Sequence, residues 1–253
     1  LTLPRTTMFP TIDQRIDATT KPPKRSVIMR QKWYSLLYLH WDFDPAQLQA
    51  MLPEGLNIDT HDDRAYIGVV PFYMHGLRLR FGPPAPAVSY FPELNLRTYV
   101  YDKNGRPGVW FFSLDAQSHL SVWIAQQAFS LNYHYAKMNY KCSPSGEVNM
   151  TCMRRGQEEQ RYSYRATKSL GPAQPGSLSY FLAERYYLFA KTRNGSLRIG
   201  KIYHAPHTLY DAEVSTYSKK LFYLNGFSEP RSDYVHAVIS PKVDVSIYSL
   251  QKI

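Results

Sequence analysis

The sequence lacks any apolar run long enough to cross a membrane, and only two of its 253 residues are cysteines. A membrane-spanning helix needs about 20 consecutive apolar residues, so we expect no membrane association. Residues 1–25 also lack the apolar segment of a secretory signal. We therefore expect a cytoplasmic protein with buried free thiols.

The two cysteines flank a predicted hairpin whose turn lies at residues 143–146. Pairing around that turn places Cys142 opposite residue 148 or 149, rather than opposite Cys152. The two thiols are then not cross-strand neighbours, and no disulfide is expected.

The familiar motifs of nucleotide, hydrolase and zinc sites are also absent. The sequence has no glycine-rich phosphate loop, nucleophile elbow or paired-cysteine signature. His204 and His207 come nearest to a metal motif, but Pro206 between them favours an extended turn and no nearby acid completes a site. We expect neither a metal ion nor a cofactor.

Positive charge is abundant but unevenly distributed. The net charge is +10, and the excess lies in residues 1–40 and 137–201. Basic residues alternate with Tyr162 and Tyr164 over residues 161–165, a pattern that fits a surface for single-stranded nucleic acid or an ordinary half-buried strand. We favour the strand and do not expect nucleic acid as the partner, although a basic protein that binds nucleic acid or an acidic partner remains an alternative.

Proline and hydrophobic patterning divide the chain into an arm and one domain. Residues 1–25 contain four prolines and no hydrophobic period, which predicts an arm that is disordered or wraps the surface. Residues 26–253 are expected to form a single domain. Within it the patterns predict helices over 44–53, 118–129 and 177–184, and strands near 65–74, 93–100, 109–114, 135–141, 147–154, 159–168, 186–192, 197–204, 213–223 and 242–250. The fold class is α+β, with a strongly curved, mostly antiparallel β-sheet and about three flanking helices.

The most informative segment is the first strand of the hairpin over 93–114. Alternate residues of a strand share a face, so Glu93, Asn95 and Arg97 lie together opposite a core face. The next strand, 109–114, is apolar on both faces, which indicates a sheet covered on both sides. Buried charge is costly unless it is paired. The cluster is therefore either a structural ion-pair network or a ligand site, unless it simply faces solvent.

Two other acidic positions have ordinary explanations. Glu184 and Arg185 end the third predicted helix, where a helix-end ion pair is the simplest interpretation and entry into a cavity the alternative. Asp115 follows a buried strand and is expected to cap the helix that begins near Ser118.

Several ordered motifs resemble the YqjF-like family of uncharacterised proteins, within the acetoacetate decarboxylase-like superfamily. They are PELNLRTYV at 92–100, GRPGVWFFSLDA at 105–116, GSLSYFLAERYYLF at 176–189 and KIYHAPHTL at 201–209. The resemblance covers about residues 27–250. It implies a sheet that forms a cone or barrel around an internal pocket, with helices packed outside.

The resemblance also bears on the chemistry. Acetoacetate decarboxylases form a Schiff base on a lysine that is followed by a second lysine, and Tyr133 and His134 occupy the matching positions here. Tyrosine cannot form a Schiff base, and Lys137 needs a shift in strand parity to point inward. Glu93 matches the family's pocket glutamate, and Arg97 belongs to the YqjF-like motif.

The expected function is the binding of a small anionic or carbonyl-bearing molecule in the internal pocket, without Schiff-base chemistry. Arg97 would hold the anion, Glu93 and Asn95 would orient it, and Tyr133 with His134 would close the site. The enzyme alternative is a non-covalent lyase, isomerase or hydratase that uses Glu93 or His134 as the base. Whether catalysis occurs, and whether the chain forms a homo-oligomer, are left open.

Overall fold

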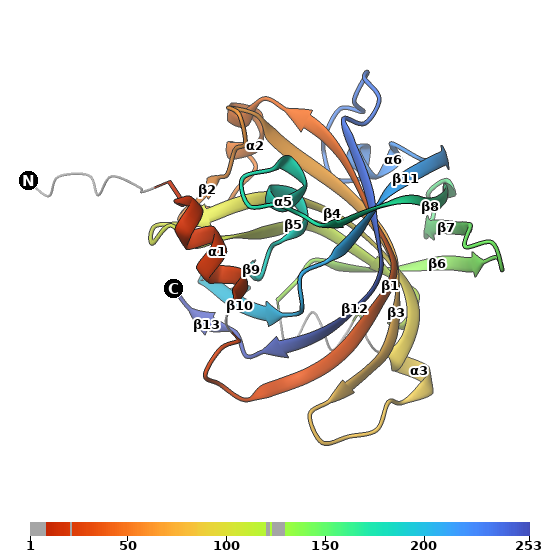
Figure 1. Cartoon of the computed structure of the whole chain (residues 1–253), viewed down its shortest axis with the longest axis horizontal. Helices are drawn as coiled ribbons and strands as arrows, with labels where there is room; N and C mark the ends of the chain where they lie inside the picture. Colours follow the sequence, from red (N-terminus) through yellow and green to blue (C-terminus); the bar gives the residue numbers. More distant parts are fainter. Residues whose placement is uncertain (1–8, 21, 120–121, 123–129) are drawn as a thin grey trace, which may run out of the picture.

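One strongly curved β-sheet forms most of the structure, a computed structural model that describes residues 9–20, 22–119, 122 and 130–253 (Figure 1). Its strands are β1 Val27–Phe43, β2 Leu56–Ile58, β3 Ala65–Leu79, β4 Tyr90–Asp102, β5 Pro107–Ala116, β6 Tyr133–Cys142, β7 Val148–Arg154, β8 Gln160–Pro172, β9 Tyr187–Lys191, β10 Leu197–Tyr203, β11 Thr208–Thr216, β12 His236–Tyr248 and β13 Gln251–Lys252.

The sheet curves round on itself because β5 and β10 each pair with additional strands. The strand order is β13-β10-β9-β5-β6-β7-β8-β11-β12-β1-β3-β4-β2, with additional pairings of β10 with β12 and of β5 with β4. Among the described strands, β5 pairs in parallel with β6 and β9, and the other pairs are antiparallel. The expected curved, mostly antiparallel sheet is confirmed, and it takes a ring-like form.

Short helices pack around the sheet. They are α1 Ile12–Thr20, α2 Pro45–Gln49, α3 Pro86–Ser89, α5 Leu178–Ala183 and α6 Lys220–Tyr223. The Asp44 side chain caps α2 and the Ser177 side chain caps α5, so two helices lie where the sequence predicts them. Most of the helix expected over 118–129 lies outside the described residues.

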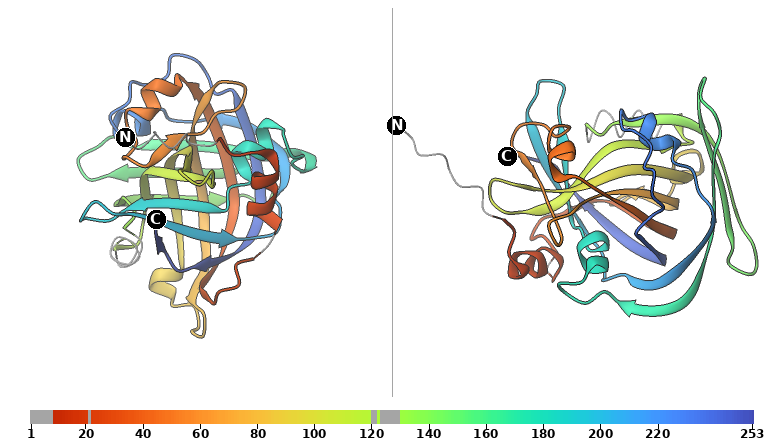
Figure 2. Two further views of the ribbon diagram at one scale, coloured as in Figure 1. Left: turned by 90° about the vertical axis from the view of Figure 1, so that its left-hand side faces the viewer. Right: turned by 90° about the horizontal axis from the view of Figure 1, so that it is seen from above.

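Two segments differ from the sequence-based expectation. Residues 12–20, inside the expected arm, form α1, which lies beside α5 in both views of Figure 2. The strand expected over 213–223 ends at Thr216, and residues 220–223 form α6 instead. Leu221 and Phe222 are fully buried there, and an apolar run this short has no period that separates a strand from a helix. The domain boundary at residue 26 stays a prediction.

The basic stretch of β8 is a half-buried strand. Tyr162 and Tyr164 are buried, whereas Arg161 and Arg165 are exposed and form ion pairs with Glu159 and Glu213. The hairpin of β6 and β7 places Cys142 opposite Val148, and both cysteines are free. Cys152 is buried as expected, whereas Cys142, near the end of the hairpin, is exposed.

A bulge in β1 decides which of its side chains point inward. Ser35 has a φ of 50°, and the register of β1 against β3 shifts between Tyr34 and Leu39. The inward-facing positions are therefore odd-numbered before Ser35 and even-numbered after it, so that Trp33 and Tyr38 line the same cavity.

Both faces of β4 are covered. Leu94 and Leu96 face a core that also contains Leu37, Trp41 and α6. The opposite face of β4 points into the interior of the curved sheet, toward β1, β5 and α5. Polar residues on that inner face are consequently removed from bulk water.

Candidate functional site

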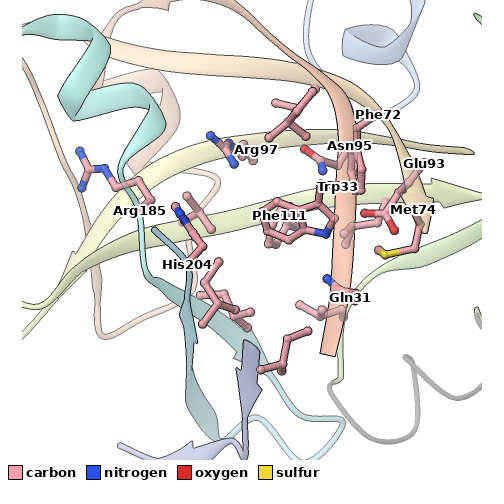
Figure 3. A pocket seen from close by; sticks show the side chains of 18 of the residues that line it. Gln31, Trp33, Phe72, Met74, Glu93, Asn95, Arg97, Phe111, Arg185 and His204 are labelled. Atoms are coloured by element: carbon pink, nitrogen blue, oxygen red, sulfur yellow. The ribbon is translucent and has the colours of Figure 1, made fainter. Parts of the chain in front are cut away.

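A cavity of about 160 Å³ lies inside the curved sheet, bounded by the inner faces of β1, β3, β4, β5, β6, β9, β10, β12 and the end of α5 (Figure 3). Most of its wall is apolar, including Trp33, Phe72 and Phe111. A small set of polar side chains interrupts this wall, which is the usual construction of a small-molecule site.

Three of these polar side chains follow one another along β4. Glu93, Asn95 and Arg97 all line the cavity, and each is at least nine-tenths buried. Since successive inward-facing residues of a strand lie about 7 Å apart, the cluster extends along the wall rather than forming one ion pair. Figure 3 shows Arg97 toward one end of the pocket and Glu93 toward the other, with Asn95 between them.

Arg97 is a buried cation without an anionic partner. Its Nη2 donates to the carbonyl oxygen of Leu182 at 3.0 Å and to the Tyr99 hydroxyl at 3.3 Å. Its Nε has no hydrogen-bond partner, and within the described ranges no carboxylate lies within 4.0 Å of the guanidinium. The Tyr38 ring lies 5.1 Å from the guanidinium carbon, which offsets part of the lost hydration. An unpaired charge in such surroundings is costly for folding, which favours a ligand over a structural network.

Arg185 lines the same cavity, but its positive charge is neutralised by a buried carboxylate. Its Nη1 donates to Asp59 Oδ2 at 2.7 Å, and Arg15 of α1 binds the same carboxylate through both oxygens at 2.6 and 2.7 Å. Burial alone would raise the pKa of Asp59, but the two guanidinium groups outweigh it and lower that pKa. Burial lowers the pKa of Arg185 to about 10, so it remains charged at neutral pH. The alternative in which Arg185 enters a cavity is the one observed.

At the other end of the cluster, Glu93 is mainly a neutral acid at pH 7. Burial raises its pKa to about 8, although hydrogen bonds from Tyr133 and Asn95 pull it down. The Tyr133 hydroxyl donates to Glu93 Oε2 at 3.0 Å. A carboxyl group that titrates near neutral pH inside a cavity is able to exchange a proton with a bound molecule.

The two histidines of the 201–209 motif lie beside the arginine end as neutral bases. His207 Nε2 lies 2.9 Å from the Tyr38 hydroxyl, and its backbone N–H donates to Glu184 Oε1 at 2.8 Å. The backbone oxygen of Ala205 accepts from His204 Nδ1 at 2.7 Å, so the neutral ring of His204 has an unprotonated Nε2. Burial lowers the pKa of His204 to about 4 and that of His207 well below its ordinary value. Neither ring adds charge near Arg97 at neutral pH.

His134 does not line this cavity, in contrast to the expectation for it. In the strand pairing of β5 with β6, His134 lies opposite Asp115. Burial, and to a smaller extent the nearby charge of Arg154, lowers the pKa of His134. Because successive residues of a strand point to opposite faces, an inward-facing Tyr133 requires His134 to point outward. The other four expected site residues, Glu93, Asn95, Arg97 and Tyr133, line one cavity.

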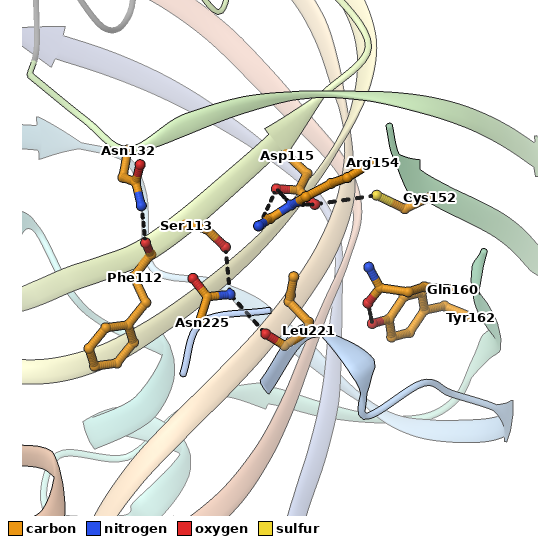
Figure 4. A network of polar contacts seen from close by, with 10 residues as sticks. All are labelled: Phe112, Ser113, Asp115, Asn132, Cys152, Arg154, Gln160, Tyr162, Leu221 and Asn225. Carbon is orange, nitrogen blue, oxygen red and sulfur yellow. Dashed lines mark hydrogen bonds and ion pairs between the residues drawn. The ribbon is translucent and has the colours of Figure 1, made fainter. Parts of the chain in front are cut away.

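The acidic group expected to cap a helix belongs instead to a separate polar cluster, shown in Figure 4. Asp115 is fully buried and accepts hydrogen bonds from Arg154 at 2.7 to 3.0 Å. The Cys152 thiol lies 3.6 Å from the same carboxylate, and burial raises the pKa of that thiol. Each charge in this cluster has a partner, so we interpret it as structural.

Sequence reasoning missed Trp33, Tyr38 and Arg185 as members of the wall. The bulge at Ser35 hides the first two, because a constant alternation along β1 does not place both on one face. The adjacent acid and base at the end of α5 are a sequence signal that could have identified Arg185 as a wall residue. Its ionic partner, however, is Asp59 and not Glu184.

The cavity wall contains no lysine among the described residues. Lys137 is exposed, four residues beyond Tyr133 on β6. A search of the described ranges also finds no group of three or more His, Cys, Asp or Glu side chains arranged to hold a metal ion. No described helix has the length and hydropathy of a membrane span.

Comparison with solved structures assigns the fold. The enduracididine biosynthesis enzyme MppR complexed with pyruvate has a TM-score of 0.64 at 10% identity, over 92% of this chain and 93% of that one. An acetoacetate decarboxylase-like enzyme from Sphingomonas wittichii RW1 has a TM-score of 0.62 at 15% identity, over 93% and 98% of the two chains. Acetoacetate decarboxylase from Legionella pneumophila has a TM-score of 0.60 at 12% identity, over 100% and 98%.

Sequence comparison gives a nearer relationship. Residues 30–244 match the model of the DUF2071 family, described as an uncharacterised conserved protein. The uncharacterised protein YqjF of Bacillus subtilis (strain 168) is 38% identical over 229 residues, which cover 89% of this chain and 92% of YqjF. This chain therefore belongs to the DUF2071 family and has the acetoacetate decarboxylase-like fold.

Proposed function

We propose that the protein binds a small carboxylate, such as a 2-oxo or 3-oxo acid, in the cavity between Arg97 and Glu93. The observation that carries the proposal is Arg97, a residue that is 8% exposed and whose guanidinium has no carboxylate partner in the described part of the chain. A bound carboxylate supplies the missing negative charge and accepts charge-assisted hydrogen bonds.

The remaining polar groups of the wall support the same ligand class. The described chain has seven buried side-chain atoms without a hydrogen-bond partner, and four of them, Trp33 Nε1, Asn95 Oδ1, Arg97 Nε and Arg185 Nη2, belong to residues of this wall. Buried polar atoms without partners are rare in folded proteins. Their concentration around one cavity indicates that a polar molecule completes it.

The fold relatives are consistent with this class of ligand. MppR is described in complex with pyruvate, and the other two structures are an acetoacetate decarboxylase and an enzyme like it. Pyruvate and acetoacetate are both small oxo acids. At 10 to 15% identity these relatives contribute the ligand class to the proposal and no residue roles.

We propose binding without a Schiff base, because the wall described here contains no lysine. Incubation with acetoacetate or pyruvate followed by borohydride should leave the mass of the protein unchanged. A reduced adduct on any lysine would contradict this part of the proposal.

The binding experiment uses the tryptophan of the wall as a reporter. Pyruvate and acetoacetate are titrated against the protein while tryptophan fluorescence is recorded, in wild type and in Trp33→Phe. A saturable change that disappears in Trp33→Phe while calorimetric binding persists locates the ligand in this cavity. If neither acid nor any larger carboxylate binds, the proposal fails.

A proton-transfer enzyme is the second candidate, and the raised pKa of Glu93 favours it. A general acid or base works best when its pKa lies near the working pH, and burial brings Glu93 to about 8. A lyase, isomerase or hydratase acting on a carbonyl compound would then lose turnover in Glu93→Gln with its fold intact. Turnover that persists in this variant would exclude Glu93 as the proton-transferring group.

A further inference from the structure

The cavity wall presents hydrogen-bond acceptors as well as donors, and an oxo acid satisfies only the donors. Trp33 Nε1, Arg97 Nε and Arg185 Nη2 are buried donors without a partner, and the oxygens of an oxo acid can accept from them. The Asn95 amide nitrogen donates to Glu93, so its Oδ1 is a buried acceptor without a partner. An ionised oxo acid has no hydrogen on an oxygen or nitrogen atom and cannot donate to such an acceptor.

His204 is a second acceptor of the wall, on the same side of the pocket as Arg97 and Arg185 (Figure 3). Because its Nδ1 donates to the Ala205 carbonyl oxygen, the neutral ring keeps a lone pair on Nε2. Its ring stacks on that of Tyr186 with 4.2 Å between the centroids, and this contact holds its orientation. Within the described residues Nε2 has no hydrogen-bond partner.

The charge around His204 decides which kind of donor suits it. Burial is the main reason for the low pKa of His204, and the charge of Arg97 adds to it, so the two side chains lie close enough to interact. An ammonium group would donate to Nε2, but a second cation near an arginine without a carboxylate partner is unfavourable. A hydroxyl group donates the same hydrogen bond without adding charge.

We propose that the ligand is a small hydroxy acid, whose carboxylate binds Arg97 and whose hydroxyl group donates a hydrogen bond to His204 Nε2. This inference rests on the proposed function and adds the substrate class. In a 2-hydroxy acid the hydroxyl group is on the carbon next to the carboxylate, so both groups bind at the arginine end of the cavity. The cavity of about 160 Å³ has room for such an acid, because about 150 Å³ holds one benzene molecule.

The test is a calorimetric titration at pH 7 with pyruvate and with each enantiomer of lactate, which share one carbon skeleton. The additional hydrogen bond should make one enantiomer of lactate bind about fivefold more tightly than pyruvate. The opposing possibility is that a bound water molecule donates to His204. Pyruvate would then bind as tightly as lactate or more tightly, and this result would overturn the inference.

His204→Phe locates the hydroxyl group, because it keeps an aromatic ring against Tyr186 and removes the acceptor. It should reduce the affinity for lactate to that for pyruvate and leave the affinity for pyruvate unchanged. His75→Phe is the matched control, since His75 is not part of the cavity wall, and both affinities should stay the same. A preference for lactate that persists in folded His204→Phe would contradict the assignment to His204.

A measurement on wild type does not depend on the folding of a variant. A hydrogen bond to an unprotonated ring nitrogen of histidine shifts the NMR resonance of that nitrogen upfield. In protein with isotope-labelled histidine, saturation with lactate should shift the Nε2 resonance of His204 in this direction, and pyruvate should not. An unchanged resonance with bound lactate would also overturn the inference.

Arg97→Met distinguishes failure of this inference from failure of the proposed function. Binding of both acids should be lost in this variant. If wild-type binding depends on Arg97 but lactate and pyruvate bind equally, only the hydroxyl assignment is wrong. If Arg97→Met changes nothing, the proposed function is wrong as well, and failure of lactate to bind wild type would overturn the inference directly.

Discussion

Arg97 and Arg185 both approach the ring of Tyr99, with guanidinium carbons 5.5 and 5.1 Å from its centroid, yet only Arg185 has a carboxylate partner. The two side chains are similarly buried and line the same cavity. Their different pairing separates a residue that stabilises the fold from one that is available to a ligand. Stability measurements on the unliganded protein should reveal this difference.

Replacement of the two arginines by methionine should have unequal effects on the free energy of unfolding. Arg185→Met leaves the buried Asp59 with one partner fewer and should cost about 3 kcal/mol. Arg97→Met removes an unpaired buried charge, so it should change stability by less than about 1 kcal/mol or increase it. Urea denaturation at pH 7 measures both. A loss for Arg97→Met as large as that for Arg185→Met would mean that Arg97 serves the fold.

The Asp59 carboxylate should be essential for stability because it joins α1 to the cavity wall. Asp59→Asn leaves two guanidinium groups without their anion and should cost about 3 to 5 kcal/mol at pH 7. The pKa of Asp59 is lowered in the folded protein, so its contribution is present above the unfolded pKa and is lost as the pH falls further. The difference in the free energy of unfolding between wild type and Asp59→Asn should therefore become smaller below about pH 4.

Asp62→Asn is the matched control for this variant. Asp62 lies three residues further along the chain, and its side chain is 89% exposed. Its φ of 50° is a conformation that asparagine adopts readily. Urea denaturation should find this variant within about 0.5 kcal/mol of wild type; an equal loss in both variants would remove the special role of Asp59.

Much of the fold was predictable because it follows from local patterns. The Asp44 and Ser177 caps, the turn between Cys142 and Val148 and the alternation along β4 are short-range features, and the structure has them where the sequence places them. α1 was not predictable in this way, because its ion pair to Asp59 spans 44 residues. A contact at that separation leaves no local signature.

The candidate site was only partly predictable for a related reason. Strand alternation identified Glu93, Asn95 and Arg97 as one face, but it did not indicate which of Tyr133 and His134 points inward. The bulge at Ser35 reverses the parity of β1, and a register shift between Leu96 and Arg97 does the same for β5. One extra residue in a strand moves each later side chain to the other face.

The titration of Glu93 should make the stability of the protein depend on pH. Its pKa is about 8 in the folded protein and near 4.5 when exposed. A raised pKa contributes stability that is complete below the unfolded value and is lost as the pH rises through the folded value. Wild type should therefore lose stability between about pH 4.5 and 8 relative to Glu93→Gln, as measured by thermal unfolding. Parallel pH profiles for the two proteins would show that Glu93 is ionised in the fold.

Tyr133 and His134 should differ in their effect on the cavity. Tyr133→Phe removes the hydrogen bond that lowers the pKa of Glu93, so the stability loss assigned to Glu93 should start at the same pH and extend to higher pH. His134→Ala alters a side chain outside the cavity wall and should leave that profile and carboxylate affinity unchanged. A fall in affinity only in His134→Ala would restore it as a site residue.

The measurement that tests the central claim most directly is the affinity of wild type, Arg97→Met and Arg97→Lys for pyruvate and acetoacetate, determined by calorimetry at pH 7. Urea denaturation of the same samples confirms that each variant is folded. Hydrogen bonds to charged groups contribute about 1.5 to 3 kcal/mol, so Arg97→Met should bind at least about tenfold more weakly than wild type. Arg97→Lys should be intermediate because it keeps the charge but not the planar geometry. Equal affinity of folded wild type and folded Arg97→Met would contradict the account.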